Sequence, residues 1–239
     1  MPYPYTLAAA ALLAGVCVFG GRLRGRSHHR RWISIAAGVS VATIFVDLLP
    51  TISEKQATFS ANAPAGAALF QEQAVYLFAM LGFVLFYGLE YMVVSSPSGE
   101  RKHPLVAFSL RIAAFALYSS FIAYLLVDSP WTGVQSLFLY SLAMAFHLLL
   151  VDHSLAEQGH QLYESRGRWI LALAVMAGWS VGMIASIPEL WLARITGFVC
   201  GGVIMNSLVV ELPEGRGGRF GYFVLSAAIY AFVLIRVVG

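Results

Sequence analysis

Eight apolar runs, each close to the length of a membrane-spanning helix, take up most of the chain. A helix needs roughly 20 mainly apolar residues to cross about 30 Å of hydrocarbon. Charged residues make up 11% of the sequence, whereas soluble domains carry about 25%. The sequence therefore predicts an integral, multi-pass membrane protein. The approximate spans are Tyr5–Gly21, Ile33–Ser53, Ala74–Ser95, Leu105–Val127, Gly133–Glu157, Ile170–Ile187, Leu190–Glu211 and Gly221–Val238.

The spans are expected to form one all-α bundle over residues 1–239. No strand-like alternation occurs, and each helix can satisfy its own backbone hydrogen bonds inside a bilayer. The longest connector, Glu54–Gln73, is rich in small and turn-forming residues and is expected to be exposed. Met1–Tyr5 has no positive charge and arginines follow the first run, so that run is expected to remain as a span.

Positive charges mark every second connector, which predicts the orientation of the bundle. Lys and Arg accumulate in cytoplasmic loops, so both termini are expected outside, in a plasma (inner) membrane. The net charge of +3 follows from this bias, and no nucleic-acid partner is expected. The marking residues are Arg22, Arg24, Arg26, Arg30, Arg31, Arg101, Lys102, Arg166, Arg168, Arg216 and Arg219.

The fifth span carries ionisable residues where an apolar helix would be expected. Such a side chain in hydrocarbon costs roughly 3 kcal/mol, so it usually faces a partner or a functional path. His147 lies at the middle of the run, and Asp152, His153 and Glu157 lie towards its cytoplasmic end. Imidazole and carboxylate are normal zinc ligands. The alternatives are a hydrogen-bonded buried histidine and a solvated helix end.

Other spans carry polar residues that could line the same path. Asp47 lies near the outer end of span 2, where it is either an interfacial residue or a partner of Arg194 on span 7. Arg111 on span 4 either extends to the cytoplasmic interface or pairs with Glu90 or Asp152. The remaining path candidates are Tyr118, Ser119, Asn206 and Glu211.

The second span from each end of the chain ends in an acidic residue followed by leucine and proline, and the two endings lie on opposite predicted membrane faces. Asp47–Pro50 closes span 2 on the outside, and Glu211–Glu214 closes span 7 on the inside. An inverted repeat, with spans 1 to 3 and 6 to 8 related and spans 4 and 5 central, would produce this arrangement.

Three stretches resemble the ZIP (ZRT/IRT-like) family of divalent metal transporters. They are AAGVSVATIFVDLLP in span 2, LGFVLFYGLEYMV in span 3 and GGVIMNSLVVELPE in span 7. The resemblance implies a 3+2+3 bundle with both termini outside, and alternating access at a metal site between spans 4 and 5. The family's metal-binding motifs are largely replaced here, by Tyr118, Ser119, Ile122 and Ala123 on span 4 and by His147, Leu148 and Val151 on span 5.

Two functions remain open at this point. The first is transport of zinc or a similar divalent cation as substrate, with no cofactor required and a homodimer left open. Its candidate ligands are His147, Asp152, His153, Glu157, Asp47 and Glu211. The second is a non-transporting protein of the same fold with a regulatory or partner-binding role, in which arginines neutralise buried carboxylates. Enzymatic activity, for example from Ser119 or Ser120 with His147, is not expected because hydroxyls commonly join transmembrane helices.

Overall fold

The computed structural model describes residues 3–23, 29–62, 73–94, 104–128, 133–211 and 220–238. Within these ranges the chain is helical and contains no β-strand. The described part contains 8 helical segments that are long and apolar enough to cross a membrane. The predictions of an all-α chain and of eight spanning-length helices are thus confirmed.

The helices follow the predicted spans, with two changes at their ends. The second span continues into a further helix, and the fifth and sixth are joined by helical residues. The elements are α1 (Tyr3–Phe19), η1 (Gly20–Leu23), α2 (His29–Thr43), η2 (Ile44–Leu48), α3 (Leu49–Asn62), α5 (Ala74–Val94), α6 (Pro104–Asp128), α7 (Val134–Leu162), η3 (Tyr163–Gly167), α8 (Arg168–Ile184), α9 (Glu189–Glu211) and α10 (Phe220–Val238).

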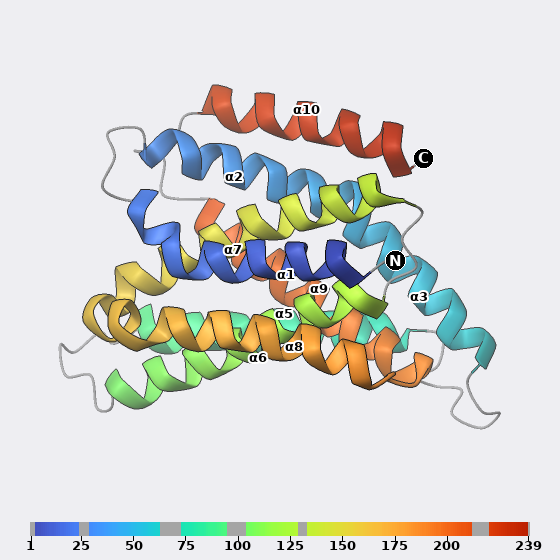
Figure 1. The fold of residues 1–239 in the computed structure, drawn as a ribbon, viewed down its shortest axis with the longest axis horizontal. Coiled ribbons are helices and arrows are strands. Elements are labelled where there is room, and N and C mark those ends of the chain that lie inside the picture. Colours follow the sequence, from blue (N-terminus) through green and yellow to red (C-terminus); the bar gives the residue numbers. More distant parts are fainter. Residues whose placement is uncertain are drawn as a thin grey trace.

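The packing of the bundle places α7 among several other helices. Its neighbours include α1, α2, α6, α9 and α10, whereas α10 lies along α2 at the edge of the bundle (Figure 1). The closest pairs are α5 with α9, α6 with α8, and α2 with α10. The N- and C-termini lie at the same end of the molecule (Figure 1). Side chains on α7 therefore have access to the interior of the bundle.

The chain does not leave its helix at Pro50, contrary to the expectation that Glu54–Gln73 is an exposed connector. Residues 54–62 belong to α3; residues 63–72 are outside the described ranges. The π-helical turn η2 precedes α3. At the C-terminal end of η2, the Leu49 N–H donates a hydrogen bond to the Ile44 carbonyl. Proline lacks an N–H but is tolerated in the first turn of a helix. A new helix beginning at Leu49 therefore accommodates Pro50.

Buried apolar contacts and one amide hold α3 on the bundle. Ile52 and Phe59 are buried. The Gln56 side-chain oxygen accepts a hydrogen bond from the Val75 N–H at 2.8 Å, in the first turn of α5. That N–H has no partner within its own helix, so Gln56 caps α5.

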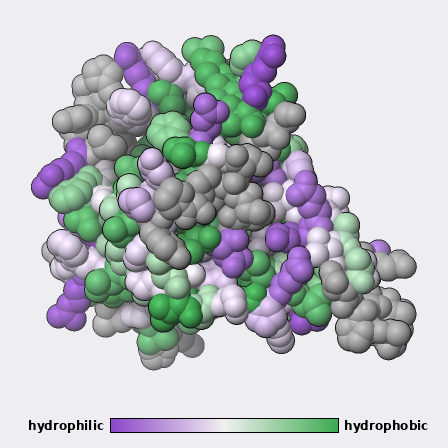
Figure 2. Space-filling model, turned by 45° about the vertical axis from the view of Figure 1, so that its right-hand side comes forward, coloured by the Kyte–Doolittle hydropathy of each residue, from purple (hydrophilic) through white to green (hydrophobic). Residues whose placement is uncertain are grey.

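Large apolar side chains cover much of the outer surface of the bundle. Ile184 is 84% exposed and Phe220 is 77% exposed, and others like them occur on α5 and α8. Figure 2 shows apolar and polar side chains together on one face, with the end that carries both termini turned forward. A water-soluble monomer rarely exposes so much apolar surface. Contact with lipid accounts for it.

Candidate functional site

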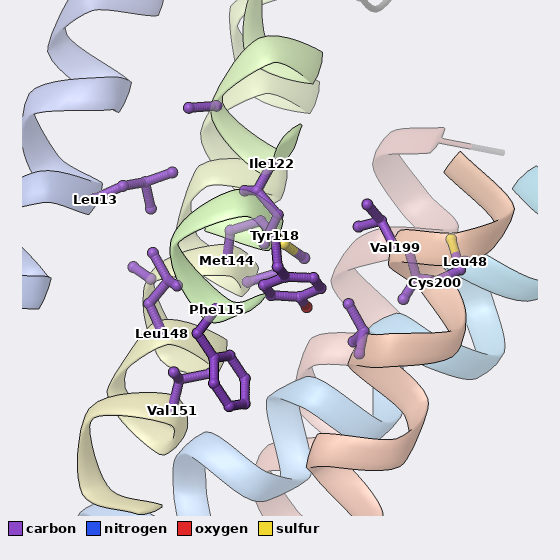
Figure 3. Close-up of a cluster of buried hydrophobic side chains, with 14 of the residues drawn as sticks. Leu13, Leu48, Phe115, Tyr118, Ile122, Met144, Leu148, Val151, Val199 and Cys200 are labelled. Atoms are coloured by element: carbon purple, nitrogen blue, oxygen red, sulfur yellow. The ribbon is translucent and has the colours of Figure 1, made fainter. Parts of the chain in front are cut away.

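A hydrogen-bonded pair of side chains occupies the middle of the bundle. His147 on α7 and Tyr118 on α6 are each 1% exposed, and the Tyr118 Oη lies 2.6 Å from the His147 Nε2. Figure 3 shows Tyr118 between α6 and the part of α9 that carries Val199 and Cys200. Phe86 of α5 packs against its ring at a centroid distance of 5.4 Å. Three helices thus hold the hydroxyl against the imidazole.

The second nitrogen of this imidazole has no described partner. The His147 Nδ1 is buried and makes no hydrogen bond to any residue that the structure describes. If Nε2 donates its proton to Tyr118, the lone pair on Nδ1 is available to a ligand. If Nε2 accepts from Tyr118, Nδ1 carries a proton and cannot bind a metal. The proton position in this one hydrogen bond decides what the centre can bind.

A buried arginine joins α5, α6 and α7, two turns from His147 towards the C-terminal end of α7. An Arg111 Nη2 of α6 lies 2.5 Å from the Glu90 Oε2 of α5 and donates to the Ser154 Oγ of α7 at 2.8 Å. Arg111 is 1% exposed, so the expectation that it extends to the membrane interface is wrong. The expected alternative, a pair with Glu90, is present. A carboxylate and a hydroxyl within reach offset the desolvation of the guanidinium.

Asp152 is held by protein groups at the start of α8. The Tyr163 hydroxyl donates to its Oδ1 at 2.8 Å, and the Arg168 Nε lies 3.6 Å from the same oxygen. Asp152 is buried and His153, beside it, is half-buried. Sequence reasoning missed Tyr163 as a partner. Residues 11 positions apart on a straight helix lie about 16 Å apart along its axis, so the spacing in the sequence could not have revealed this contact.

Asp47 lies in η2 and is half-buried. Among the described residues it forms no ion pair, and the expected pair with Arg194 is not formed. The Arg194 guanidinium instead lies over three aromatic rings, at centroid distances of 5.0 Å for Phe59, 5.9 Å for Phe78 and 4.8 Å for Trp191. Aromatic faces attract a cation, which explains why Arg194 needs no carboxylate there.

Ser119 and Asn206, two further path candidates, are buried and form no hydrogen bond with each other. Ser119 is 0% exposed and Asn206 is 4% exposed. Neither the Ser119 Oγ nor the Asn206 Nδ2 has a hydrogen-bond partner in the described part of the chain. The Ser120 hydroxyl donates to the Leu117 carbonyl of its own helix at 2.7 Å. No hydrogen bond between His147 and Ser119 or Ser120 is present among these residues.

Of the six predicted metal ligands, four have described side chains: His147, Asp152, His153 and Asp47. No group of three His, Cys, Asp or Glu side chains in the described part of the protein is arranged to hold a metal ion. Asp152 is bonded to Tyr163, and His147 is bonded to Tyr118. The side chains of Glu157 and Glu211 lie outside the described residues.

No family model matches the chain, and no curated protein matches it. The resemblance found in spans 2, 3 and 7 therefore rests on the residues of those spans themselves.

Proposed function

We propose that this chain is a ZIP-like membrane protein with a regulatory or partner-binding role, in which arginines occupy the cation path. The observation that carries the proposal is the Arg111 cluster. Arg111 binds Ser154, which lies seven residues, or two turns, beyond His147 on the same face of α7. A cation moving along that face from His147 would meet the buried Arg111–Glu90 pair, in which a guanidinium already occupies the carboxylate that the cation would need.

The helix packing supports the inverted repeat that this fold requires. Under the repeat, span 1 corresponds to span 6, 2 to 7, 3 to 8 and 4 to 5. The contact of α5 with α9 then corresponds to that of α10 with α2, and both are among the closest in the bundle. The contact of α6 with α8 likewise corresponds to that of α7 with α1.

The same kind of close contact joins the two proposed halves at two places. A Cβ on Gly201 of α9 would overlap the Ala79 carbonyl oxygen of α5 and lie 2.9 Å from the Phe83 nitrogen. A Cβ on Gly38 of α2 would overlap the Phe223 carbonyl oxygen of α10 and lie 2.9 Å from the Ala227 nitrogen. Each glycine fits between residues i and i+4 of its partner helix.

The proposal predicts that the purified protein does not transport zinc. We expect zinc uptake into proteoliposomes containing a zinc-sensitive dye to match that of protein-free liposomes, because Arg111 opposes the cation. Calorimetric titration should show no stoichiometric zinc binding in the wild type or in His147→Ala. Saturable uptake that is lost in His147→Ala would contradict the proposal.

Transport of zinc or a similar divalent cation is the second candidate, and Asp47 is the observation that favours it. Within the described residues this carboxylate forms no ion pair, and it lies in a π-helical turn, which is frequent at functional sites. A metal-binding histidine usually donates its other N–H to a polar group, as His147 could to Tyr118. In this case zinc should bind one to one, His147→Ala and Asp47→Asn should weaken binding, and Glu164→Gln, at an exposed position, should not.

A further inference from the structure

Aromatic rings from three helices surround one arginine near the start of α9. Its guanidinium lies within 6 Å of the ring centres of Phe59 on α3, Phe78 on α5 and Trp191 on α9. Phe59 is buried, Phe78 is half-buried and Trp191 is 54% exposed. The arginine, Arg194, is itself half-buried. The cluster thus lies at the surface of the bundle, with one ring anchored in the interior.

The rings leave the N–H groups of Arg194 without an oxygen acceptor. An aromatic ring attracts the positive charge of a guanidinium, but the five N–H donors of arginine still require hydrogen bonds. Within the described ranges no carboxylate pairs with Arg194, and none of its N–H groups makes a hydrogen bond. Because Arg194 is half-buried, these donors can meet a ligand from outside the protein.

Arg194 lies near one edge of the membrane-spanning region. It follows the first residue of α9, Glu189, by five positions, which places it about 7.5 Å from that end of the helix. Exposed tryptophans such as Trp191 are frequent at the level of the lipid headgroups. An arginine side chain at this depth can extend to the same level. The nearest anions that a bilayer presents there are the phosphates of its lipids.

We propose that Arg194 binds the phosphate group of a phospholipid at this end of the bundle. A planar guanidinium can donate two parallel hydrogen bonds to phosphate oxygens. The three rings restrict the guanidinium to one position, so less conformational freedom is lost when the lipid binds. The exposed Trp191 ring offers an apolar surface beside the headgroup.

Modification of arginine by phenylglyoxal tests the site in the wild-type protein. The full chain in detergent is treated with phosphatidylglycerol or with monogalactosyldiacylglycerol of identical acyl chains, which has no phosphate. Peptide mass spectrometry then reports the modification rate of Arg194. We expect the concentration of phosphatidylglycerol that halves this rate to be about fivefold lower than that of the galactolipid, since one arginine near a membrane surface contributes about that factor. Equal protection by the two lipids would overturn the proposal.

Arg236 is the matched control within the same molecule. It lies near the end of α10, at the end of the bundle that carries both termini (Figure 1). It is exposed and has its guanidinium 5.3 Å from the centre of a single ring, that of Phe232. The two lipids should slow its modification equally. A preference for phosphatidylglycerol as large as that of Arg194 would overturn the proposal, because the three-ring cluster would then have no effect.

Native mass spectrometry of variants gives a second measurement. Arg194→Gln should lower retention of phosphatidylglycerol about fivefold, for the reason given above, and Arg236→Gln should leave it unchanged. Retention that is unchanged in Arg194→Gln, or lowered equally in both variants, would contradict the assignment of the site to Arg194.

Inorganic phosphate offers the same chemistry as a lipid headgroup and is the source to separate from it. We expect inorganic phosphate alone to leave the modification rate of Arg194 unchanged, because it has no acyl chains to hold it at the bundle surface. Protection by inorganic phosphate at the same concentration as phosphatidylglycerol would assign the site to a soluble phosphate compound and would overturn the lipid proposal.

Discussion

Several buried polar side chains in this bundle are bonded to one another across different helices. Tyr118 meets His147, Arg111 meets Glu90 and Ser154, and Tyr163 meets Asp152. Inside hydrocarbon an unsatisfied polar group costs several kcal/mol, so each bond strongly favours one arrangement of the helices. The same bonds that stabilise the bundle also occupy His147 and Asp152, two of the predicted metal ligands.

The Arg111 cluster can be tested by removing one charge. Glu90→Gln leaves a buried, unpaired guanidinium, and we expect it to lower the free energy of unfolding by about 3 kcal/mol. Thermal and denaturant unfolding of the purified protein in detergent would measure this loss. The double variant Glu90→Leu/Arg111→Met should recover most of it, because both charges are then absent.

Glu164→Gln serves as the control for that series. Its carboxylate lies 3.2 Å from Arg168, but its side chain is 42% exposed. Exposed ion pairs contribute about 0 to 1 kcal/mol, so the effect on unfolding should be small. If Glu90→Gln is as mild as Glu164→Gln, the Arg111 pair does not hold the three helices together.

Helices approach each other closely where one of them presents a glycine. The contact of Gly201 with Ala79 joins α9 to α5, and that of Gly38 with Phe223 joins α2 to α10. Small residues at such contacts let helix backbones pack directly in membranes. These contacts therefore set the spacing of the two helix pairs.

Substitution of these glycines tests both the contact and the proposed repeat. Gly201→Ala should lower the free energy of unfolding by about 1 to 3 kcal/mol, because the added methyl must displace a backbone carbonyl. Gly38→Ala should cost a similar amount if the halves are equivalent. Gly15→Ala is the control, since a Cβ there has nothing within 4 Å. Loss of stability at Gly201 but not at Gly38 would contradict equivalent halves.

For the whole molecule, the arrangement across the membrane follows from where the arginines lie. The connection Ala185–Pro188 between α8 and α9 lies at the opposite end of α8 from η3. If the basic connectors lie inside, that connection is predicted to face outside together with both termini.

Cysteine labelling in intact cells tests this orientation. Ser186→Cys should react with a membrane-impermeant maleimide, and Ser165→Cys, in η3, should react only after permeabilisation, because the membrane shields it. Both serines are exposed, so accessibility within the protein does not separate them. The opposite labelling pattern would show that the bundle is inverted and that the Lys/Arg bias misleads here.

The sequence by itself determined that the chain is helical and that eight segments can cross a membrane. Both properties depend on the local density of apolar residues, which is visible without any tertiary contact. It did not reveal that α3 continues beyond Pro50, because that depends on a π-helical turn and on Gln56 reaching Val75. Only the tertiary structure decided which polar groups meet, as Arg111 does with Glu90. Such partners lie on different helices, and the distance between them depends on how the whole bundle packs.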